Sequence, residues 1–518
     1  MVIKNIIKAK TLVSVLLTST LGLTACGGGG GSSDSAVVNS GPVMVEDAEL
    51  NVVIQANNLT GDPAAGRNLP TIDDPLAQLG MKLFFTKALG GQLDSACVSC
   101  HHPLLAGGDA LALPIGVDAV DPDFIGPGRE HASSGFDYDG GPTVPRNSPT
   151  TFNIGLYDKT VFHDGRVEIL GNVVSSNGEG SDIRTPDVWP QSADASALNL
   201  IQAQAFFPVT SEEEMRAKFL VQSGDENNNR EKTATRNKQV RDALAERLAD
   251  QSIPNSWLQE FQQAFASTDD AMTLITYENI ALALGEYQRS QIFIDNPWNA
   301  YIAGDQTAIS ESAKRGALLF YNTVDNGGAD CAACHSGDFY TDEDFHVLAI
   351  PQIGRGKENG LTGDDDFGRF RETWIDKYKY AFRTPALLNV EMTAPYGHDG
   401  AYLSLRDMVV HHLDPRAAIE AYDFELTSLS ENVQTGISAE NAEANTQLAL
   451  AQFETLQAEG ESALSILDLS DQQVDDLVEF LLALTDPCLK DSDCLAPWIP
   501  TESSVDPDNL RLIPSNEF

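Results

Sequence analysis

Basic residues are scarce in this chain of 518 residues, which has 33 Lys and Arg against 76 Asp and Glu. The formal charge of −43 at pH 7 argues against nucleic-acid binding, because the phosphate backbone would be repelled. The charge permits steering of a basic protein partner, and it suits a solvated surface in a salty habitat equally well. Hydrophobic content of 42% still allows a core, and the length suggests two or three domains at roughly 150 residues each.

A long apolar run is also missing at the N-terminus. "TLVSVLLTSTLGL" follows the lysine-bearing "MVIKNIIKAK" and is too short to predict a membrane-spanning helix. It leads to "LTAC", which resembles a bacterial lipobox, so Cys26 is the predicted lipidation site. We interpret residues 1–26 as a lipoprotein signal peptide and residues 27–60, which begin "GGGGGSS", as a flexible linker. The protein is then exported to the periplasm or cell surface and held at the membrane by lipid alone; a plain secretory signal is the alternative.

Cysteine is rare, and the seven residues fall into recognisable groups. Cys26 is taken by the lipobox, and four others form "CVSCH" and "CAACH", that is, Cys97, Cys100 and His101, then Cys331, Cys334 and His335. The C-x-x-C-H pattern is the attachment motif of c-type haem, in which both thiols bind the porphyrin and the His binds iron. A thiol–disulfide exchange site is the alternative, but it would need neither histidine. The remaining Cys488 and Cys494 are predicted to form a disulfide in an oxidising compartment.

Helical periodicity frames each haem motif. Helices are predicted at residues 74–85 and 310–322 before the motifs, and at 276–293 and 470–487 as closing helices, with Ser310 and Ser470 as N-caps and Pro487 as a stop. The predicted fold is mainly α, with two c-type cytochrome domains, each wrapped around one covalently attached haem, and long loops. The predicted domains are residues 61–299 and 300–487, followed by a C-terminal tail, 488–518, that wraps in extended form.

Several motifs in order resemble those of bacterial di-haem cytochrome c peroxidases and their MauG-like relatives, over roughly residues 70 to 487. They are "LGMKLFFTKALGGQLDSACVSCHHP", "PRNSPTTFN", "FHDGR", "QAFFPVTSEEEM" and "FRTPALLNVEMTAPYGHDG". The resemblance implies reduction of hydrogen peroxide to water. Electrons from a small cytochrome or cupredoxin would enter at the C-terminal haem and be used at the N-terminal haem. Family members are often dimers, so a homodimer is one expectation.

The resemblance also assigns residues near the first haem. Glu214 falls on the acid–base position, Gln204 on the position that hydrogen-bonds the bound peroxide, and Pro208 on the position that shapes the pocket. Without the family match, Glu214 would be interpreted as one of three solvated glutamates in "SEEEM". The family's calcium ion between the haems implies ligation by Asn147, Thr393 and Pro395, with backbone and side-chain oxygens suited to a hard cation.

The sequence departs from the family pattern between the haems. The aromatic residue of F-W-D-G-R, which helps electrons cross in the family, is His163 here. Trp189 is one replacement to consider. It lies in a stretch of about forty residues between Asp164 and Gln204, whose polar, Gly-rich part we expect to project as a surface loop. His131 is a candidate distal ligand of the first haem, with an ordinary surface histidine as the alternative.

The sixth ligand of the second haem separates the subfamilies, which use Met or Tyr. The family position is the twelfth residue after Gly400, which is His412. His411, Met408 and Met392 are rivals. A histidine at this position leaves three functions to compare: a peroxidase, a MauG-like oxidase that modifies a residue such as Trp on a partner protein, and a pure electron-transfer cytochrome. The peroxidase is the leading prediction, because an electron wire has no need of Gln204, Pro208 and Glu214.

Overall fold

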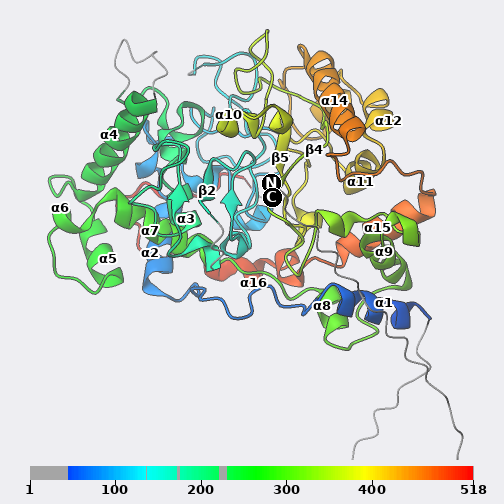
Figure 1. Cartoon of the computed structure of the whole chain (residues 1–518). Coiled ribbons are helices and arrows are strands. Elements are labelled where there is room, and N and C mark those ends of the chain that lie inside the picture. The colour runs from blue at the N-terminus through cyan, green and yellow to red at the C-terminus, as the bar shows by residue number, and fades with distance from the viewer. Residues whose placement is uncertain (1–44, 136, 172–175, 221–229, 517–518) are drawn as a thin grey trace, which may run out of the picture. The chain divides into compact units, whose positions relative to one another are not determined.

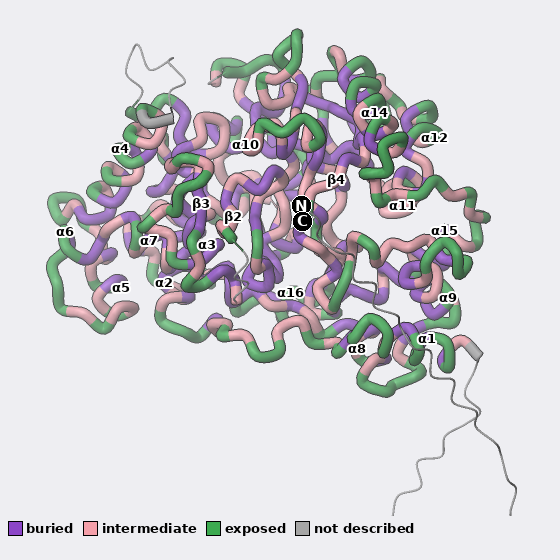
Figure 2. Tube along the Cα trace, in the orientation of Figure 1, coloured by how far each residue is buried: buried purple, intermediate pink, exposed green. Residues whose placement is uncertain are grey.

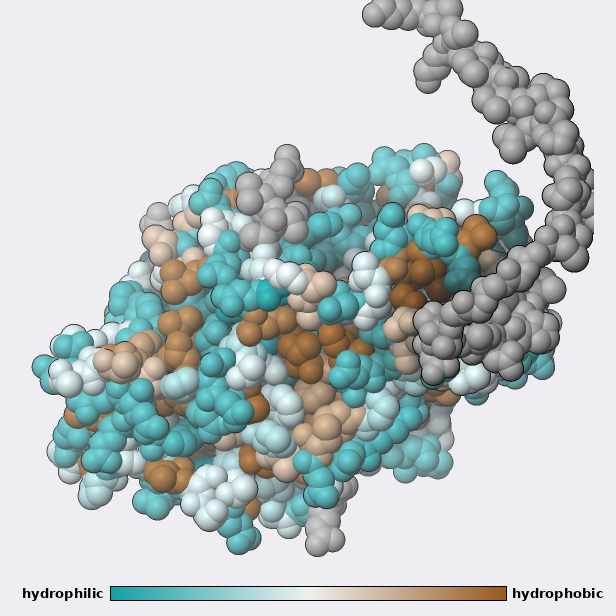
Figure 3. All heavy atoms as spheres, turned by 90° about the horizontal axis from the view of Figure 1, so that it is seen from below, coloured by the Kyte–Doolittle hydropathy of each residue, from teal (hydrophilic) through white to brown (hydrophobic). Residues whose placement is uncertain are grey.

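The computed structural model describes residues 45–135, 137–171, 176–220 and 230–516. These residues are mostly helices and long loops, which confirms the predicted mainly α fold. The signal peptide and Cys26 lie outside the described residues. No helix in the described ranges combines the length and the apolar composition needed to cross a membrane. On the face drawn in Figure 3, hydrophilic residues predominate around a smaller group of apolar ones, as expected for a strongly acidic chain.

Most of the elements are labelled in Figure 1. The helices are α1 (Val45–Ala56), α2 (Pro75–Phe85), α3 (Leu200–Gln204), α4 (Arg230–Ala249), α5 (Trp257–Ala264), α6 (Ala271–Leu274), α7 (Tyr277–Arg289), α8 (Pro297–Ile302), α9 (Glu311–Tyr321), α10 (Phe370–Thr373), α11 (Leu405–Leu413), α12 (Pro415–Glu420), α13 (Thr427–Asn432), α14 (Ala442–Glu459), α15 (Asp471–Leu482) and α16 (Ser492–Leu495). The strands are β1 (Thr160–Val161), β2 (Val167–Ile169) and β3 (Ile183–Arg184), which form one antiparallel sheet, and β4 (Phe345–Val347) and β5 (Ala381–Arg383), which form another.

Two helix crossings repeat the same geometry. Helix α2 packs on α7, and α9 packs on α15. A Cβ atom added to Gly80 would lie 1.9 Å from the Ala283 carbonyl oxygen, and one added to Gly316 would lie 1.8 Å from the Asp476 carbonyl oxygen. Only glycine allows backbones to approach this closely. All four helices were predicted from periodicity, and Ser310 and Ser470 cap α9 and α15 as expected. Helix α15, however, ends at Leu482, five residues before Pro487.

The apolar core has two large clusters. One is built on α2, α3, α4 and α7, and includes Phe84, Leu200 and Tyr287. The other is built on α1, α9 and α15, and includes Phe320 and Phe480. Buried segments run through the interior of the described chain, and exposed segments lie at its rim (Figure 2). We refer to the parts before and after residue 300 as the first half and the second half.

The predicted flexible linker, residues 27–60, is wrong from residue 45 onward. Residues 45–56 form α1, which packs on α9 and buries Leu50 and Val53 on one face. Asp47 accepts a hydrogen bond from the Tyr301 hydroxyl at 2.8 Å and pairs with the Lys314 ammonium at 2.8 Å. Leucine and valine three residues apart give the helix an apolar face, so this segment belongs to the core of the second half.

The polar stretch after β2 does not project as a loop over its described part. Residues 172–175 lie outside the described residues, but Ile183 and Arg184 form β3, which pairs with β2 and is buried. The Arg184 guanidinium pairs with Glu168 at 2.8 Å and with Glu372 at 2.7 Å. Two carboxylates, one from each half of the chain, make burial of this charge possible.

The C-terminal tail returns to the first half. Its backbone N–H at Leu512 donates to the Phe85 carbonyl at 2.8 Å, and the Trp257 indole N–H donates to Asp508 at 2.7 Å. Cys488 and Cys494 are joined by a disulfide with their Cα atoms 5.4 Å apart. The tail therefore connects the end of the second half to the surface of α2 and α5.

Candidate functional site

The first C-x-x-C-H motif forms a tight turn after α2. Cys97 and Cys100 are free thiols, and burial raises the pKa of Cys97 to about 12. The His101 ring nitrogen Nδ1 lies 3.0 Å from the Gly107 carbonyl oxygen. This contact fixes the ring and leaves Nε2 as the nitrogen available to iron, as metal-binding histidines require. Burial lowers the pKa of His101, which favours the neutral, ligating form.

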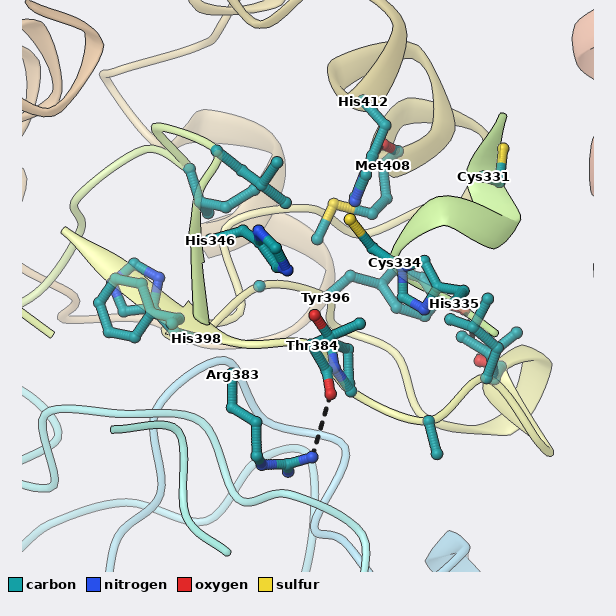
Figure 4. A pocket seen from close by; sticks show the side chains of 18 of the residues that line it. Cys331, Cys334, His335, His346, Arg383, Thr384, Tyr396, His398, Met408 and His412 are labelled. Atoms are coloured by element: carbon teal, nitrogen blue, oxygen red, sulfur yellow. Dashed lines mark hydrogen bonds between the residues drawn. The ribbon is translucent and has the colours of Figure 1, made fainter. Parts of the chain in front are cut away.

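The second motif repeats this arrangement beside a large cavity. The His335 Nδ1 atom lies 3.1 Å from the Tyr340 carbonyl oxygen. A cavity of about 600 Å³, here called the second-half cavity, is lined by Cys331, Cys334, His335, Met408 and His412, among other residues. Figure 4 shows these side chains gathered around one space, with His412 coming from α11 opposite the Cys334–His335 turn. A largely apolar cavity beside two free thiols fits a covalently attached haem.

His412 is positioned as the partner of His335. The two imidazole ring centroids are 6.4 Å apart, and His412 Nδ1 lies 2.8 Å from the Met408 carbonyl oxygen. Metal–imidazole bonds of about 2.0–2.1 Å place two ring centroids roughly 6 Å apart across one ion. The observed centroid spacing therefore matches that of two imidazoles that share one metal ion.

The rival ligands differ in position. His411 is fully buried, with Nε2 2.7 Å from the Leu348 carbonyl oxygen and Nδ1 2.7 Å from the Tyr402 hydroxyl. Both ring nitrogens are therefore occupied, which excludes His411 as a ligand in this geometry. Met392 packs in a separate cluster with Cys488 and Trp498. Met408 lines the second-half cavity and remains close to the site.

The predicted peroxide-site residues lie on one continuous segment. Gln204 ends α3, Pro208 begins the next turn, and Glu214 sits in a single π-helical turn, Glu212–Arg216, capped by the Ser211 hydroxyl. Such turns are often found at functional sites. Burial raises the pKa of Glu214, while the cations of Arg166 and Lys357 oppose this shift. The carboxyl group of Glu214 also raises the pKa of Cys97 and Cys100, so it lies near the first motif.

The region between the motifs is polar and buried. Arg146 binds Asp366 through two bonds of 2.6 and 2.8 Å and Asp164 through one of 2.6 Å. His163, at the family's tryptophan position, lies with Nε2 3.0 Å from the Asn147 carbonyl oxygen and lines the second-half cavity. Trp189 is 59% exposed, so it does not replace the missing tryptophan.

The predicted calcium residues meet beside the same region. Asn147 and Thr393 line one small pocket together with Asp109, and Pro395 lines the adjoining second-half cavity. The Asn147 amide N–H₂ donates to the Leu111 carbonyl at 2.8 Å, which leaves its oxygen free to face a cation. Asp109 is buried, and burial raises its pKa to about 7. Oxygen donors with an uncompensated carboxylate fit a hard cation. Sequence reasoning missed Asp109, because a lone Asp in a loop carries no signal.

His131 is mostly buried in a loop. Its Nδ1 atom lies 3.0 Å from the Ala132 carbonyl oxygen, and its ring stacks on Tyr138 with centroids 5.5 Å apart. Its Nε2 atom has no hydrogen-bond partner among the described residues. Ligation of the first haem by His131 stays a prediction.

The chain resembles known proteins over most of its described length. A sequence model of the di-haem cytochrome c peroxidase family matches residues 74–307. Methylamine utilization protein MauG of Methylorubrum extorquens is 26% identical over 357 residues, which cover 67% of this chain and 73% of that protein. Cytochrome c551 peroxidase of Pseudomonas aeruginosa is 25% identical over 355 residues, which cover 68% and 74%. A crystal structure of a MauG-like protein associated with microbial copper homeostasis has the same fold, with a TM-score of 0.50, 19% identity, and coverage of 83% of this chain and 97% of that chain.

These relatives include both peroxidases and MauG proteins at nearly equal identity. The di-haem description of the matched family implies two haem c groups, and the two C-x-x-C-H turns of this chain offer two thiols and one histidine for each. Through residues 74–307 and these relatives, the chain is similar to the di-haem cytochrome c peroxidase family.

Proposed function

We propose that the protein reduces hydrogen peroxide to water, taking two electrons from a small cytochrome or cupredoxin. The observation that carries the proposal is Glu214, a half-buried carboxyl group held on a π-helical turn near the first haem motif, where partial burial raises its pKa. The half that carries His335 receives the electrons, and the half that carries His101 uses them. A solvated glutamate on a helix would need neither burial nor this turn.

Three residues of the first half, Glu214, Gln204 and Pro208, each have a separate role in the proposed reaction. When bound, the haem supplies an iron that can accept peroxide and pass it electrons. Glu214 would accept a proton from one peroxide oxygen and return it to the other, so that the second oxygen can leave as water. The Gln204 amide donates a hydrogen bond to the bound oxygen, and Pro208 keeps the pocket open by presenting no donor or bulky side chain. Two protons and two electrons then convert one peroxide into two waters.

The second half is arranged for electron transfer. His335 and His412 would hold the haem iron of this half between them, so this iron would carry electrons and would not bind peroxide. An imidazole in place of Met lowers the reduction potential, so a donor of lower potential is expected. Between the halves, Asn147, Thr393 and Pro395 would hold a calcium ion, with Asp109 beside them.

The protein acts in the periplasm or at the cell surface. The apolar N-terminal stretch and "LTAC" support export and lipidation at Cys26. The disulfide between Cys488 and Cys494 and the haem motifs suit the same compartment.

A MauG-like oxidation of a residue on a partner protein is the second candidate. His412, in place of the Met of the peroxidases, favours it, because a ligand that stabilises oxidised iron suits an oxidase. A pure electron-transfer role has less support, because electron transfer alone does not require an acid–base residue at the position of Glu214.

Optical and electron paramagnetic resonance spectra of the oxidised and half-reduced protein test the peroxide site. A high-spin haem that reacts with peroxide is expected in at least one of the two states. Absence of a high-spin signal in both states would overturn the proposal. Turnover of a reduced small cytochrome, compared with mass analysis of candidate protein partners, separates the peroxidase from the MauG-like oxidase.

A further inference from the structure

Trp374 is an exposed tryptophan of the second half. It follows α10 (Figure 1), and its side chain is 72% exposed. The chain has five tryptophans, all within the described residues, and only Trp189 and Trp374 are exposed. Trp374 packs on Phe370, with ring centroids 5.6 Å apart, whereas Trp189 has no ring partner among the described residues. The two exposed tryptophans therefore differ in what lies behind them.

A row of aromatic rings runs inward from Trp374. The ring centroid of Phe370 lies 6.0 Å from that of Phe367, which lies 5.5 Å from that of Tyr380. These separations are within the range of about 4.5–7 Å that packed aromatic pairs adopt. Tyr380 is 2% exposed and lines the second-half cavity beside the second haem motif. The row, here called the aromatic route, therefore connects the surface with the cavity that suits the second haem.

The inner end of the aromatic route has a proton acceptor. The Tyr380 hydroxyl donates a hydrogen bond of 2.7 Å to Asp365, which is fully buried. A phenol that loses an electron becomes a strong acid, so it is oxidised more easily when a carboxylate takes its proton in the same step. Burial also raises the pKa of Asp365, which makes its carboxylate a better proton acceptor. Tyr380 is therefore equipped to lose and regain an electron.

A cation beside the aromatic route limits which ring can be oxidised. The Lys379 ammonium lies 3.9 Å from the Phe367 ring centroid and 5.1 Å from that of Tyr380. This positive charge disfavours a second positive charge on either ring. Tyr380 avoids the repulsion, because transfer of its proton to Asp365 leaves the oxidised ring neutral. The phenylalanine rings resist oxidation and fill the gap between the two oxidisable residues, Tyr380 and Trp374.

We infer that the aromatic route carries oxidising equivalents from the second haem to the surface, and that Trp374 is oxidised when peroxide acts without an electron donor. The inference rests on the proposed function, which supplies hydrogen peroxide as the oxidant. Two electrons leave Trp374 one at a time and pass through Tyr380, whose proton moves to Asp365 and returns each time. Trp374 gains an oxygen atom from water and releases two protons. Hydrogen peroxide takes up two electrons and two protons and becomes two waters.

The test uses the purified di-haem protein with both haems oxidised and no electron donor. The protein is mixed with a small excess of hydrogen peroxide, and its peptides are analysed by mass spectrometry. Trp374 should gain one oxygen atom. Trp189, which is 59% exposed, is the internal control for oxidation by free peroxide and should stay unmodified. Equal modification of the two tryptophans, or consumption of peroxide without modification of Trp374, would overturn the inference.

Two variants interrupt the aromatic route. Tyr380→Phe keeps the ring and removes the phenol proton, and Phe370→Leu removes the ring that contacts Trp374. Each should lose most of the Trp374 modification. Tyr378→Phe is the matched control, because Tyr378 lines the same cavity but lies outside the row of rings, and it should behave as the unaltered protein.

Unchanged modification in both Tyr380→Phe and Phe370→Leu would overturn the inference, as would protection of Trp374 by Tyr378→Phe alone. If the absorption spectrum shows that Tyr380→Phe has lost the second haem, Phe370→Leu, which is nearer the surface, decides the question.

The proposed function is tested separately, by turnover of a reduced small cytochrome with hydrogen peroxide. Modification of Trp374 without such turnover would overturn the proposed function and support the aromatic route. Turnover with an unmodified Trp374 would overturn the route alone. A protein that shows neither would overturn both.

Discussion

The imidazole rings of His335 and His412 face each other across the second-half cavity, with their centroids 6.4 Å apart. The neighbouring His411 points away and uses both ring nitrogens in hydrogen bonds to Leu348 and Tyr402. Two adjacent histidines therefore have different tasks, because successive residues of a helix project about 100° apart.

Replacement of His412 should change the second haem alone. His412→Gly is expected to convert its low-spin electron paramagnetic signal to high spin, and His412→Met should keep low spin and raise its midpoint potential. His411→Gln is the control. It should keep the low-spin signal and lower the free energy of unfolding by about 1–3 kcal/mol, because buried hydrogen bonds are lost. An unchanged spectrum in His412→Gly would point to Met408 as the ligand.

Glu214→Gln should slow peroxide turnover about 10²–10⁴-fold and leave both haems attached. Burial raises the pKa of Glu214, and the proposed role needs the carboxylate, so activity should fall on acidification at a pH above the ordinary value of 4.5. In Glu214→Gln this acid limb should disappear from the pH–rate profile. Glu212→Gln, in the same turn, should retain both the rate and the limb. If the acid limb of the pH–rate profile persists in Glu214→Gln, the limb reports the titration of another group.

Removal of calcium should destabilise the interface between the halves. Treatment with a chelator is expected to lower the melting temperature of the unaltered protein, because a ligand bound only by the folded state stabilises it. Asn147→Ala should have the melting temperature of the chelator-treated unaltered protein, whether or not calcium is added. Asn326→Ala, which changes an exposed residue, should respond to calcium and chelator as the unaltered protein does. Metal analysis that finds no calcium in the unaltered protein would contradict the site.

Gly316→Ala should separate α9 from α15. Its Cβ atom would lie 1.8 Å from the Asp476 carbonyl oxygen, so the helices must move apart. We expect a loss of roughly 1–3 kcal/mol or more in the free energy of unfolding, measured by denaturant titration, and weaker retention of the second haem. Gly108→Ala is the steric control, since its Cβ would meet nothing closer than 3.6 Å. If the two variants have equal free energies of unfolding, α9 and α15 can move apart with little loss of stability, and the prediction is wrong.

The local features of the structure could be predicted from the sequence alone. The haem motifs, the four helices that frame them and the caps at Ser310 and Ser470 follow from short-range patterns, because periodicity and capping depend on residues a few positions apart. Residues 45–60 were misread as linker because the preceding glycine run dominates the local composition. The apolar face of α1 is buried by packing on α9, which lies more than 250 residues later in the sequence, so local composition does not predict this helix.

Which charged side chains pair with each other depends on the fold of the whole chain. No spacing in the sequence brings Asp366 to Arg146 or Glu372 to Arg184. These contacts arise because a second-half loop folds across the first half, and buried charges then require partners from distant segments. The two haem motifs can be recognised without the structure, because each is a short contiguous pattern. The fold decided that His412 and not His411 faces His335, because the direction of each side chain depends on how α11 is placed over the cavity.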